Sequence, residues 1–146
     1  MASQLYSLGC LEIVNNGLAL KTLKVALLRS SPAYTFSHAH QYFSSVSPSE
    51  CNATNYTAGG KTVALTIRDD GAAGKVEIEI PDQTWTALGG ATNNTIQWAI
   101  LYASTGNNAT SPLIAAWDLT GSTYTTNGTD FMLDFDASAG NITFDY

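Results

Sequence analysis

Apolar and polar residues alternate with a period of two in four separate segments of this chain, and this pattern restricts the fold more than any other feature. The segments are 23–27, 62–68, 75–80 and 131–136. Successive side chains of a β-strand point to opposite faces, so each segment predicts a strand with one buried face and one face in water. Two further segments, 95–103 and 112–119, are apolar on both sides, which predicts strands covered on both faces.

The connections between these segments contain residues that tolerate a positive φ. They are Asp69-Asp70-Gly71, Thr105-Gly106-Asn107-Asn108, Asn127-Gly128 and Ala139-Gly140-Asn141. Short turns of this kind join antiparallel neighbours, so we expect consecutive strands mostly to pair with each other. With the C-terminal segment 141–146 the pattern predicts about seven or eight strands, as in an antiparallel β-sandwich or a jelly-roll-like domain.

The N-terminal segment has a different period. Its apolar residues recur at three-residue steps, and it ends in Asn and Gly residues that typically close a helix. The residues concerned are Leu5, Leu8, Leu11, Val14 and Asn15-Asn16-Gly17. We therefore expect a short helical arm over residues 1–17, followed by strands. Since 146 residues is the size of one ordinary domain, residues 1–146 are expected to form a single all-β domain.

The charge of the chain argues against several classes of partner. Charged residues make up 12% of the chain, about half the usual share. The net charge is −6 and the six Lys and Arg residues form no basic run, so a nucleic-acid partner is not expected. The sequence has no apolar stretch of membrane-spanning length and no secretory signal pattern. We therefore expect no membrane partner, synthesis in the cytoplasm, and reduced thiols at Cys10 and Cys51.

The longest stretch without a clear period is residues 30–60. In a compact domain a segment of this length is usually functional, and we expect it to be a long loop that serves as a docking arm. Aromatic side chains are typical anchors of protein contacts, and both histidines of the chain lie among them. The candidate interface residues of this segment are Tyr34, Phe36, His38, His40, Tyr42 and Phe43.

The two histidines raise the alternative of a metal site, because His38 and His40 share one face of an extended segment. Further ligands would have to come from Glu50 and Cys51, and these positions complete no recognised ligand spacing. We therefore expect no metal. The histidines are interpreted as adaptable polar partners inside an aromatic docking surface.

Two carboxylate pairs, Glu77/Glu79 and Asp134/Asp136, lie two residues apart on expected strands, a separation of about 7 Å that inverting glycosidases use. A simpler interpretation places each pair on the solvated face of a half-buried strand, where charge discourages unwanted sheet pairing. The adjacent glycines of "TAGGKT" predict a turn rather than a phosphate-binding loop. We therefore expect that the chain is not an enzyme and that it has no catalytic residue and no cofactor.

The three tryptophans are expected in different surroundings. Trp98 and Trp117 stand in the most apolar segments and are expected in the core. Trp85, between Thr84 and Thr86, is expected to be more exposed, which makes it a further candidate interface residue. An exposed Trp with nearby tyrosines would also suit a carbohydrate-binding β-sandwich module, an alternative from another class of protein.

Five short segments follow one another along most of the chain: "LKVALLRSS", "YTAGGKTV", "TWTAL", "WAILYASTG" and "ATSPLIAAWDL". In this order they resemble a family of small virion proteins of tailed bacteriophages. The likeness extends from about residue 4 to residue 146, and its motifs include no catalytic residue. The stretch 32–51 departs from the family by being more aromatic and less acidic.

The resemblance implies a structural role at the capsid surface, as a cement or decoration protein that clamps neighbouring subunits of the major capsid protein. High copy number on a lattice multiplies weak contacts, so such a protein needs no deep ligand pocket. A homo-oligomer is expected, with a trimer favoured at threefold lattice points. A tail or head–tail connector component is an alternative on the same particle.

Overall fold

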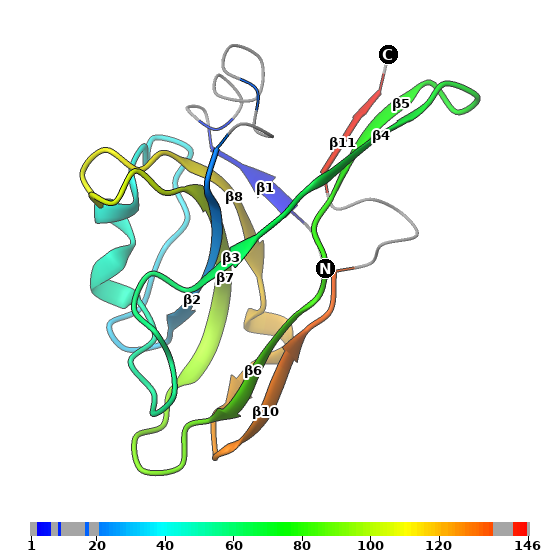
Figure 1. Ribbon diagram of the computed structural model, residues 1–146. Coiled ribbons are helices and arrows are strands. Elements are labelled where there is room, and N and C mark those ends of the chain that lie inside the picture. The colour runs from blue at the N-terminus through cyan, green and yellow to red at the C-terminus, as the bar shows by residue number, and fades with distance from the viewer. Residues whose placement is uncertain (1–2, 7–8, 10–16, 18–20, 136–141, 146) are drawn as a thin grey trace.

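The computed structural model describes residues 3–6, 9, 17, 21–135 and 142–145, and these residues form mainly antiparallel β-sheets (Figure 1). The strands are β1 (Ser3–Leu5), β2 (Leu23–Arg29), β3 (Lys61–Val63), β4 (Thr66–Asp70), β5 (Lys75–Glu79), β6 (Gln83–Leu88), β7 (Thr95–Ala103), β8 (Leu113–Asp118), β9 (Tyr124–Thr125), β10 (Thr129–Leu133) and β11 (Ile142–Asp145). Short 3₁₀ helices are η2 (Phe43–Ser45), η3 (Ser47–Ser49) and η4 (Thr120–Ser122). The prediction of an all-β chain is confirmed.

A six-stranded sheet forms the centre of the described chain, in the order β1-β8-β7-β2-β3, with β9 paired to one end of β7. Strand β7 lies between β2 and β8, and its alternate side chains enter two different cores. Ala99, Leu101 and Ala103 face one core, and Trp98, Ile100 and Tyr102 face the other. Because both faces are covered, consecutive positions must be apolar, which confirms the interpretation of 95–103.

The inner face of the central sheet packs against two smaller sheets, the β6-β10 pair and the sheet β11-β5-β4 (Figure 1). Side chains from both sides meet in one core: Leu27, Leu101 and Trp117 come from the central sheet, and Trp85, Phe131, Phe135 and Ile78 from the segments opposite. Removal of this apolar surface from water is the main stabilising contribution to the fold.

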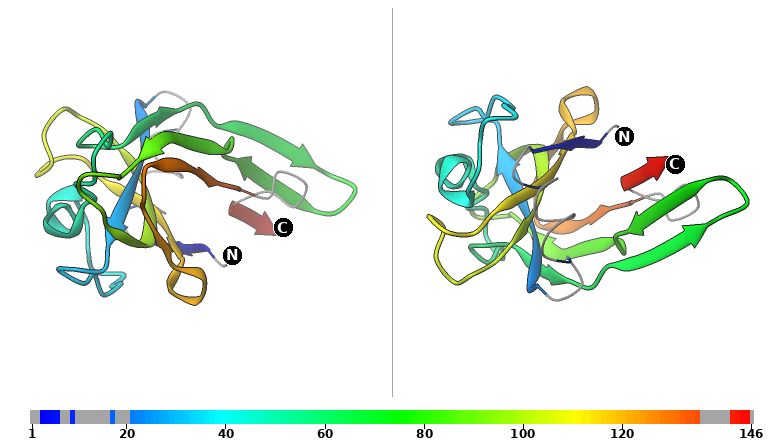
Figure 2. Two further views of the ribbon diagram at one scale, coloured as in Figure 1. Left: turned by 90° about the horizontal axis from the view of Figure 1, so that it is seen from below. Right: turned by 90° about the horizontal axis from the view of Figure 1, so that it is seen from above.

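The chain passes from the central sheet to the opposite side between β3 and β4. The expected alternating segment 62–68 is therefore divided, with β3 paired to β2 and β4 paired to β5. Burial falls along this segment: Val63 is buried, whereas Ile67 is 52% exposed. Figures 1 and 2 show the reason, since the β4–β5 hairpin extends away from the rest of the molecule.

Residues 30–60 cover the outer face of the central sheet. The backbone N–H of Phe43 donates to the carbonyl of Ser111 at 2.9 Å, and the N–H of Cys51 donates to the carbonyl of Leu27 at 2.8 Å. The second core lies beneath this cover and contains Tyr6, Ala26, Leu28, Tyr34, Phe43, Val46, Trp98, Ile100, Tyr102, Leu113 and Ala116. The segment expected to be a docking arm is thus attached to the chain's own sheet along much of its length.

The predicted helical arm over 1–17 differs from the structure at its first described residues, although Gly9 is helical. Ser3–Leu5 form β1, which pairs antiparallel with β8, so the helix prediction is wrong for these residues. The edge of β8 offers unpaired backbone groups that a strand can satisfy, and this distant partner decides the local conformation. Apart from Tyr6, Gly9 and Gly17, the rest of the segment lies outside the described residues.

The pairing of strands also differs from the expectation. Consecutive strands pair in β2–β3, β4–β5 and β7–β8, but the other ladders of the described chain join strands that are distant in sequence. These are β1–β8, β2–β7, β6–β10, β5–β11 and β7–β9. The expectation that consecutive strands mostly pair is therefore wrong, and the expectation of antiparallel pairing is confirmed. The turn predicted at 139–141 lies outside the described residues.

Candidate functional site

The aromatic loop residues differ in exposure. Tyr34 and Phe43 are buried, His38 is exposed, and Phe36, His40 and Tyr42 have intermediate exposure. Tyr34 and Phe43 pack inside this chain, so only the more exposed residues are accessible to a partner. The structure therefore assigns different positions to side chains that the sequence pattern places together.

Ring contacts attach this loop to the central sheet. The Phe36 ring stacks on Trp98 with centroids 6.1 Å apart and an interplanar angle of 16°. The Phe43 ring stacks on Tyr102 at 4.1 Å and 15°. Since Trp98 and Tyr102 both belong to β7, the loop is fixed to the strand at the centre of the sheet.

The two histidines connect the loop to the N-terminal strand. Nδ1 of His38 lies 2.9 Å from the carbonyl oxygen of Leu5 and is the donor, because a carbonyl only accepts. Nδ1 of His40 is 3.1 Å from the hydroxyl of Tyr34, which in turn is 2.9 Å from the hydroxyl of Tyr6. Burial raises the pKa of both tyrosines, so the chain of hydroxyls stays neutral. Within the described residues, no three His, Cys, Asp or Glu side chains gather where they could hold a metal ion.

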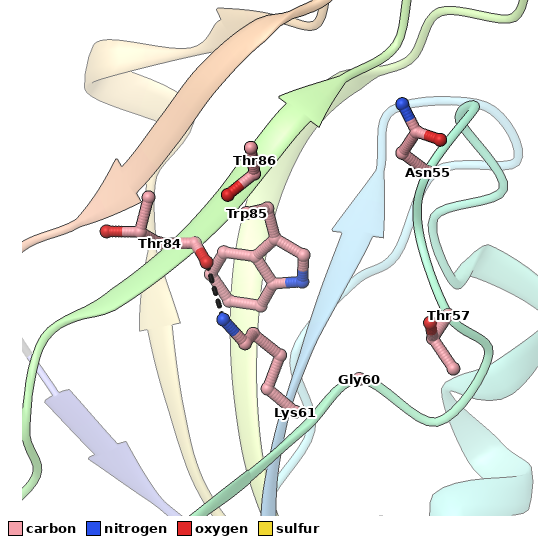
Figure 3. Close-up of a pocket in the computed structure, with 7 residues that line it drawn as sticks. All are labelled: Asn55, Thr57, Gly60, Lys61, Thr84, Trp85 and Thr86. Atoms are coloured by element: carbon pink, nitrogen blue, oxygen red, sulfur yellow. Dashed lines mark hydrogen bonds between the residues drawn. The ribbon is translucent and has the colours of Figure 1, made fainter.

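Trp85 lies at a depression of about 310 Å³ on the opposite side of the central sheet (Figure 3). The lining residues are Asn55, Thr57, Gly60, Lys61, Thr84, Trp85 and Thr86. The side chain of Trp85 is only 4% exposed, so the expectation of an exposed ring is wrong. It alternates with Thr84 and Thr86, which are exposed, and so occupies the buried face of β6. Trp98 and Trp117 are buried as predicted, with 7% and 1% exposure.

The faces and the edge of the Trp85 ring have different surroundings. The ring packs against Phe131 with centroids 5.9 Å apart, and Nζ of Lys61 lies 5.7 Å from its centroid. The same Nζ donates to the carbonyl of Thr84 at 2.5 Å. In Figure 3 the indole nitrogen points into the space between β6 and the turn that contains Thr57 and Gly60. The ring face is therefore not a stacking platform, but its polar edge is presented to the depression.

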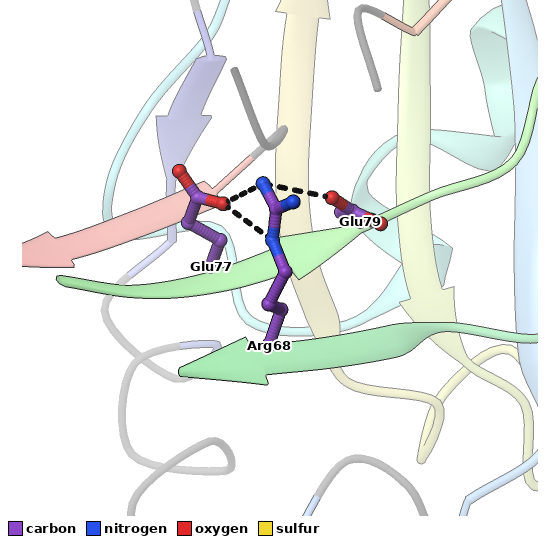
Figure 4. Close-up of polar contacts among 3 residues, drawn as sticks. All are labelled: Arg68, Glu77 and Glu79. Carbon is purple, nitrogen blue, oxygen red and sulfur yellow. Dashed lines mark hydrogen bonds and ion pairs between the residues drawn. The ribbon is translucent and has the colours of Figure 1, made fainter. Parts of the chain in front are cut away.

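The carboxylates Glu77 and Glu79 lie on one face of β5, beside Arg68 of β4 (Figure 4). Nε of Arg68 donates to Oε2 of Glu77 at 3.0 Å, Nη2 donates to the same oxygen, and Nη2 lies 3.2 Å from Oε1 of Glu79. The side chain of Glu77 is only 6% exposed, so the interpretation of a solvated face is wrong for this residue. Asp134 is exposed, as that interpretation requires, and Asp136 lies outside the described residues.

Replacing Arg68 should destabilise the β4-β5-β11 sheet. In Arg68→Ala the nearly buried carboxylate of Glu77 loses its cation, and we expect a loss of about 1–3 kcal/mol in the free energy of unfolding. Urea unfolding and hydrogen exchange of the β5 amides measure it. Adding Glu77→Gln removes the unpaired charge and should recover most of the loss. Unchanged stability and exchange in Arg68→Ala would contradict this prediction.

A polar cluster around Glu50 was not indicated by any sequence motif. Oε1 of Glu50 accepts from the backbone N–H of Gly59 at 2.5 Å and from the hydroxyl of Tyr56 at 3.0 Å. The Tyr56 hydroxyl also accepts from the N–H of Leu27 at 3.1 Å, and the Tyr102 hydroxyl donates to the carbonyl of Gly59 at 2.7 Å. These contacts join the turn before β3 to β2 and β7. Their partners are far apart in sequence, which explains why no local pattern marks the cluster.

Burial dominates the electrostatics of this cluster. It raises the pKa of the Glu50 carboxyl above its ordinary value of 4.5, although the bonds from Gly59 and Tyr56 and the charge of Lys24 oppose the shift. Burial and the nearby Glu50 charge raise the pKa of Tyr102 to about 12. Burial also raises the pKa of the Cys51 thiol. None of these shifts produces a reactive nucleophile, since each favours the uncharged form.

Glu50 should make stability depend on pH. Its pKa is higher in the folded than in the unfolded chain, so its contribution is most favourable below about pH 4.5 and is lost as the pH rises toward the folded-state pKa. Glu50→Gln keeps an oxygen that can accept both hydrogen bonds but cannot ionise. Wild type should therefore lose stability relative to Glu50→Gln as the pH rises from 4.5. Denaturant unfolding at a series of pH values from 4.5 upward measures the difference, and Asp134→Asn is the surface control. Parallel curves of stability against pH for wild type and Glu50→Gln would contradict the prediction.

The comparisons with known proteins yield no relative. No family model matches the chain, and neither a curated protein nor a solved structure matches it. Among the described residues, no helix has the length and hydrophobicity required to span a bilayer.

Proposed function

We propose that this chain is a non-enzymatic structural protein of a bacteriophage virion that binds the major capsid protein at the capsid surface as a cement or decoration protein. The observation that supports this most is the projecting β4–β5 hairpin of the sheet β11-β5-β4, whose outer strand β4 pairs only with β5 among the described strands. Ile67 of β4 is 52% exposed in this hairpin (Figures 1 and 2). A projecting hairpin whose outer strand has no second partner strand among the described residues, and which carries an exposed apolar side chain, is suited to contact with another protein.

The edge of β4 can bind a partner in a specific way. A strand at the edge of a sheet presents unpaired N–H and C=O groups, to which an extended segment of a neighbouring subunit can add. Ile67 would supply apolar contact beside this ladder. On a capsid each contact is repeated many times, so modest affinity at a single hairpin is sufficient for stable decoration.

The outward side of the loop 30–60 is a second surface in this proposal. Phe36, His38, His40 and Tyr42 remain at least partly exposed there, above rings that are fixed to β7. A rigidly held aromatic and polar surface loses little conformational entropy when it binds. We assign it to contacts with the shell or with the other copies of a trimer.

We also infer that residues 1–146 form one β-sandwich of the jelly-roll-like type. Support comes from the continuous core shared by the central sheet and the smaller sheets opposite it. A role without catalysis is supported by Arg68, which binds the carboxylates of both Glu77 and Glu79, so each of these groups already has a structural ion-pair partner. A tail or head–tail connector component is the alternative on the same particle.

Recruitment to capsids tests the proposal. Heads assembled from the major capsid protein of the same genome should bind the purified chain in a fixed stoichiometry, measured by co-sedimentation and electron microscopy. Ile67→Asp should weaken recruitment by about tenfold or more, because it places a charge in the apolar contact. Met132→Asp is the matched control, since Met132 is 58% exposed but lies outside the hairpin. Heads that recruit no wild-type protein would overturn the capsid role, and rings of about six or twelve copies in solution would favour the connector.

A further inference from the structure

We infer that the depression beside Trp85 is a binding site for one residue of a neutral saccharide, which the edge of the buried indole recognises by hydrogen bonding. This inference does not depend on a capsid role. It rests on the lining of the depression, on an accessible indole N–H that has no partner among the described residues, and on the way β6 and the turn 55–60 are held together.

The first step concerns the indole N–H. Trp85 is more than nine-tenths buried, yet its N–H has no hydrogen-bond partner among the described residues. Among the described residues the indole nitrogen is not one of the fully buried polar atoms that lack a partner, so it keeps some access to solvent, and in Figure 3 it points toward the depression. A donor at the edge of a depression is hydrated in the empty site, and a ligand oxygen can take the place of that water.

The second step concerns the groups around this donor. Nδ2 of Asn55 donates to the carbonyl of Ala87 at 2.8 Å, which leaves Oδ1 as an acceptor without a partner in the described structure. The hydroxyls of Thr57 and Thr86 likewise have no partner there, and both residues are exposed. One donor, one acceptor and two hydroxyls that can act either way match the hydroxyls of a sugar, each of which donates and accepts.

Other classes of small ligand fit less well. Lys61 is the one cation among the lining residues, and its ammonium already donates to Thr84 and lies over the Trp85 ring. A carboxylate would also meet the free acceptor oxygen of Asn55. An apolar ligand would leave the indole N–H and the hydroxyls unpaired. A volume of about 310 Å³ is at the lower end of small-molecule sites, which suits a single sugar ring.

The site is already formed without a ligand. The bond from Asn55 to the carbonyl of Ala87 ties the turn to β6, and the N–H of Gly89 donates to the carbonyl of Thr54 at 2.8 Å. Lys61 begins β3, which pairs with β2. Because the walls belong to paired strands and a tied turn, little conformational entropy is lost on binding.

The test uses the full chain labelled with ¹⁵N. The chain has three tryptophans, so three indole N–H resonances can be assigned by Trp→Phe variants. The probes are the methyl glycosides of glucose, galactose, mannose and N-acetylglucosamine, with sodium acetate as the anionic probe. We expect at least one glycoside to shift the Trp85 indole resonance in a saturable way and acetate to leave it unchanged.

Variants decide whether the indole edge binds the sugar. Trp85→Phe keeps a ring in the core but removes the N–H and should weaken binding by about tenfold or more. Trp98→Phe, a matched change on the other face of the central sheet, should leave the affinity unchanged. Should Trp85→Phe fail to fold, Thr86→Val at an exposed position of β6 should weaken binding severalfold.

Several results would overturn the inference: no shift with any glycoside, a shift produced by acetate alone, or a glycoside affinity that Trp85→Phe and Thr86→Val leave unchanged. Recruitment to capsid heads is measured separately and should be unaffected by Trp85→Phe. Failure of the sugar site is therefore distinguishable from failure of the capsid role.

Discussion

Gly60→Ala should destabilise the protein more than any other glycine substitution in the turn before β3. Gly60 has a φ of +73°, a conformation that costs an L-residue about 1–2 kcal/mol. An added Cβ would also overlap the carbonyl oxygen of Val25 and lie 2.7 Å from Cα of Ala26. Both contacts are with the backbone of β2, which cannot move without disturbing its pairing with β3 and β7. Strain and overpacking together predict a loss of about 2–5 kcal/mol.

Gly106→Ala is the matched control for this prediction. Gly106 has a φ of +83°, but an added Cβ would meet no atom within 4 Å. Its replacement should therefore cost only about 1 kcal/mol, the cost of the conformation itself. Urea unfolding followed by circular dichroism measures both variants. Equal losses in the two would show that the close approach of Gly60 to β2 does not contribute.

Trp117→Ala should have an effect of similar or larger size, about 3–5 kcal/mol. Trp117 is 1% exposed and lies in β8, where its ring meets Phe135 edge-on with centroids 5.0 Å apart. Phe135 follows β10, so this pair joins the central sheet to the segments opposite it. Truncation at Trp117 would leave a cavity between them that a rigid sheet cannot collapse to fill.

Met132→Ala is the control, because Met132 lies in β10 near Phe135 in sequence but is 58% exposed. It should change the free energy of unfolding by no more than about 0.5 kcal/mol. Phe135→Leu is a milder test of the same contact, with an expected loss of about 1 kcal/mol, and is informative if Trp117→Ala does not fold. A loss below about 1 kcal/mol in Trp117→Ala would contradict a core shared between the two sides.

The two proposed sites use different parts of the surface. The hairpin with Ile67 offers backbone edge and apolar contact, whereas the depression beside Trp85 offers hydrogen-bonding groups around a fixed indole. The loop that carries His38 and His40 is attached to β1 and β7, so these histidines already have a structural role in the chain itself.

The pattern of residues determined several of the strands, although not β1 or the short β9. The doubly apolar segment 95–103 coincides with β7, and alternation correctly predicted β5 and β10. Alternation also indicates that Trp85 is buried, because the residue stands between two exposed threonines of β6. The prediction of an exposed ring gave too much weight to the polarity of these neighbours. These features depend on neighbours two positions apart, and local stereochemistry is sufficient to define them.

The tertiary structure alone decided which strands pair, where the loop 30–60 lies, and how deeply polar groups are buried. Ser3–Leu5 become a strand because β8 offers an edge more than a hundred residues away. Glu77 is buried although its position in the alternation is polar, because Arg68 from the neighbouring strand neutralises it. The physical reason is the same in each case. Pairing energy and burial arise between segments that are distant in the chain, and no periodicity within one segment records its partner.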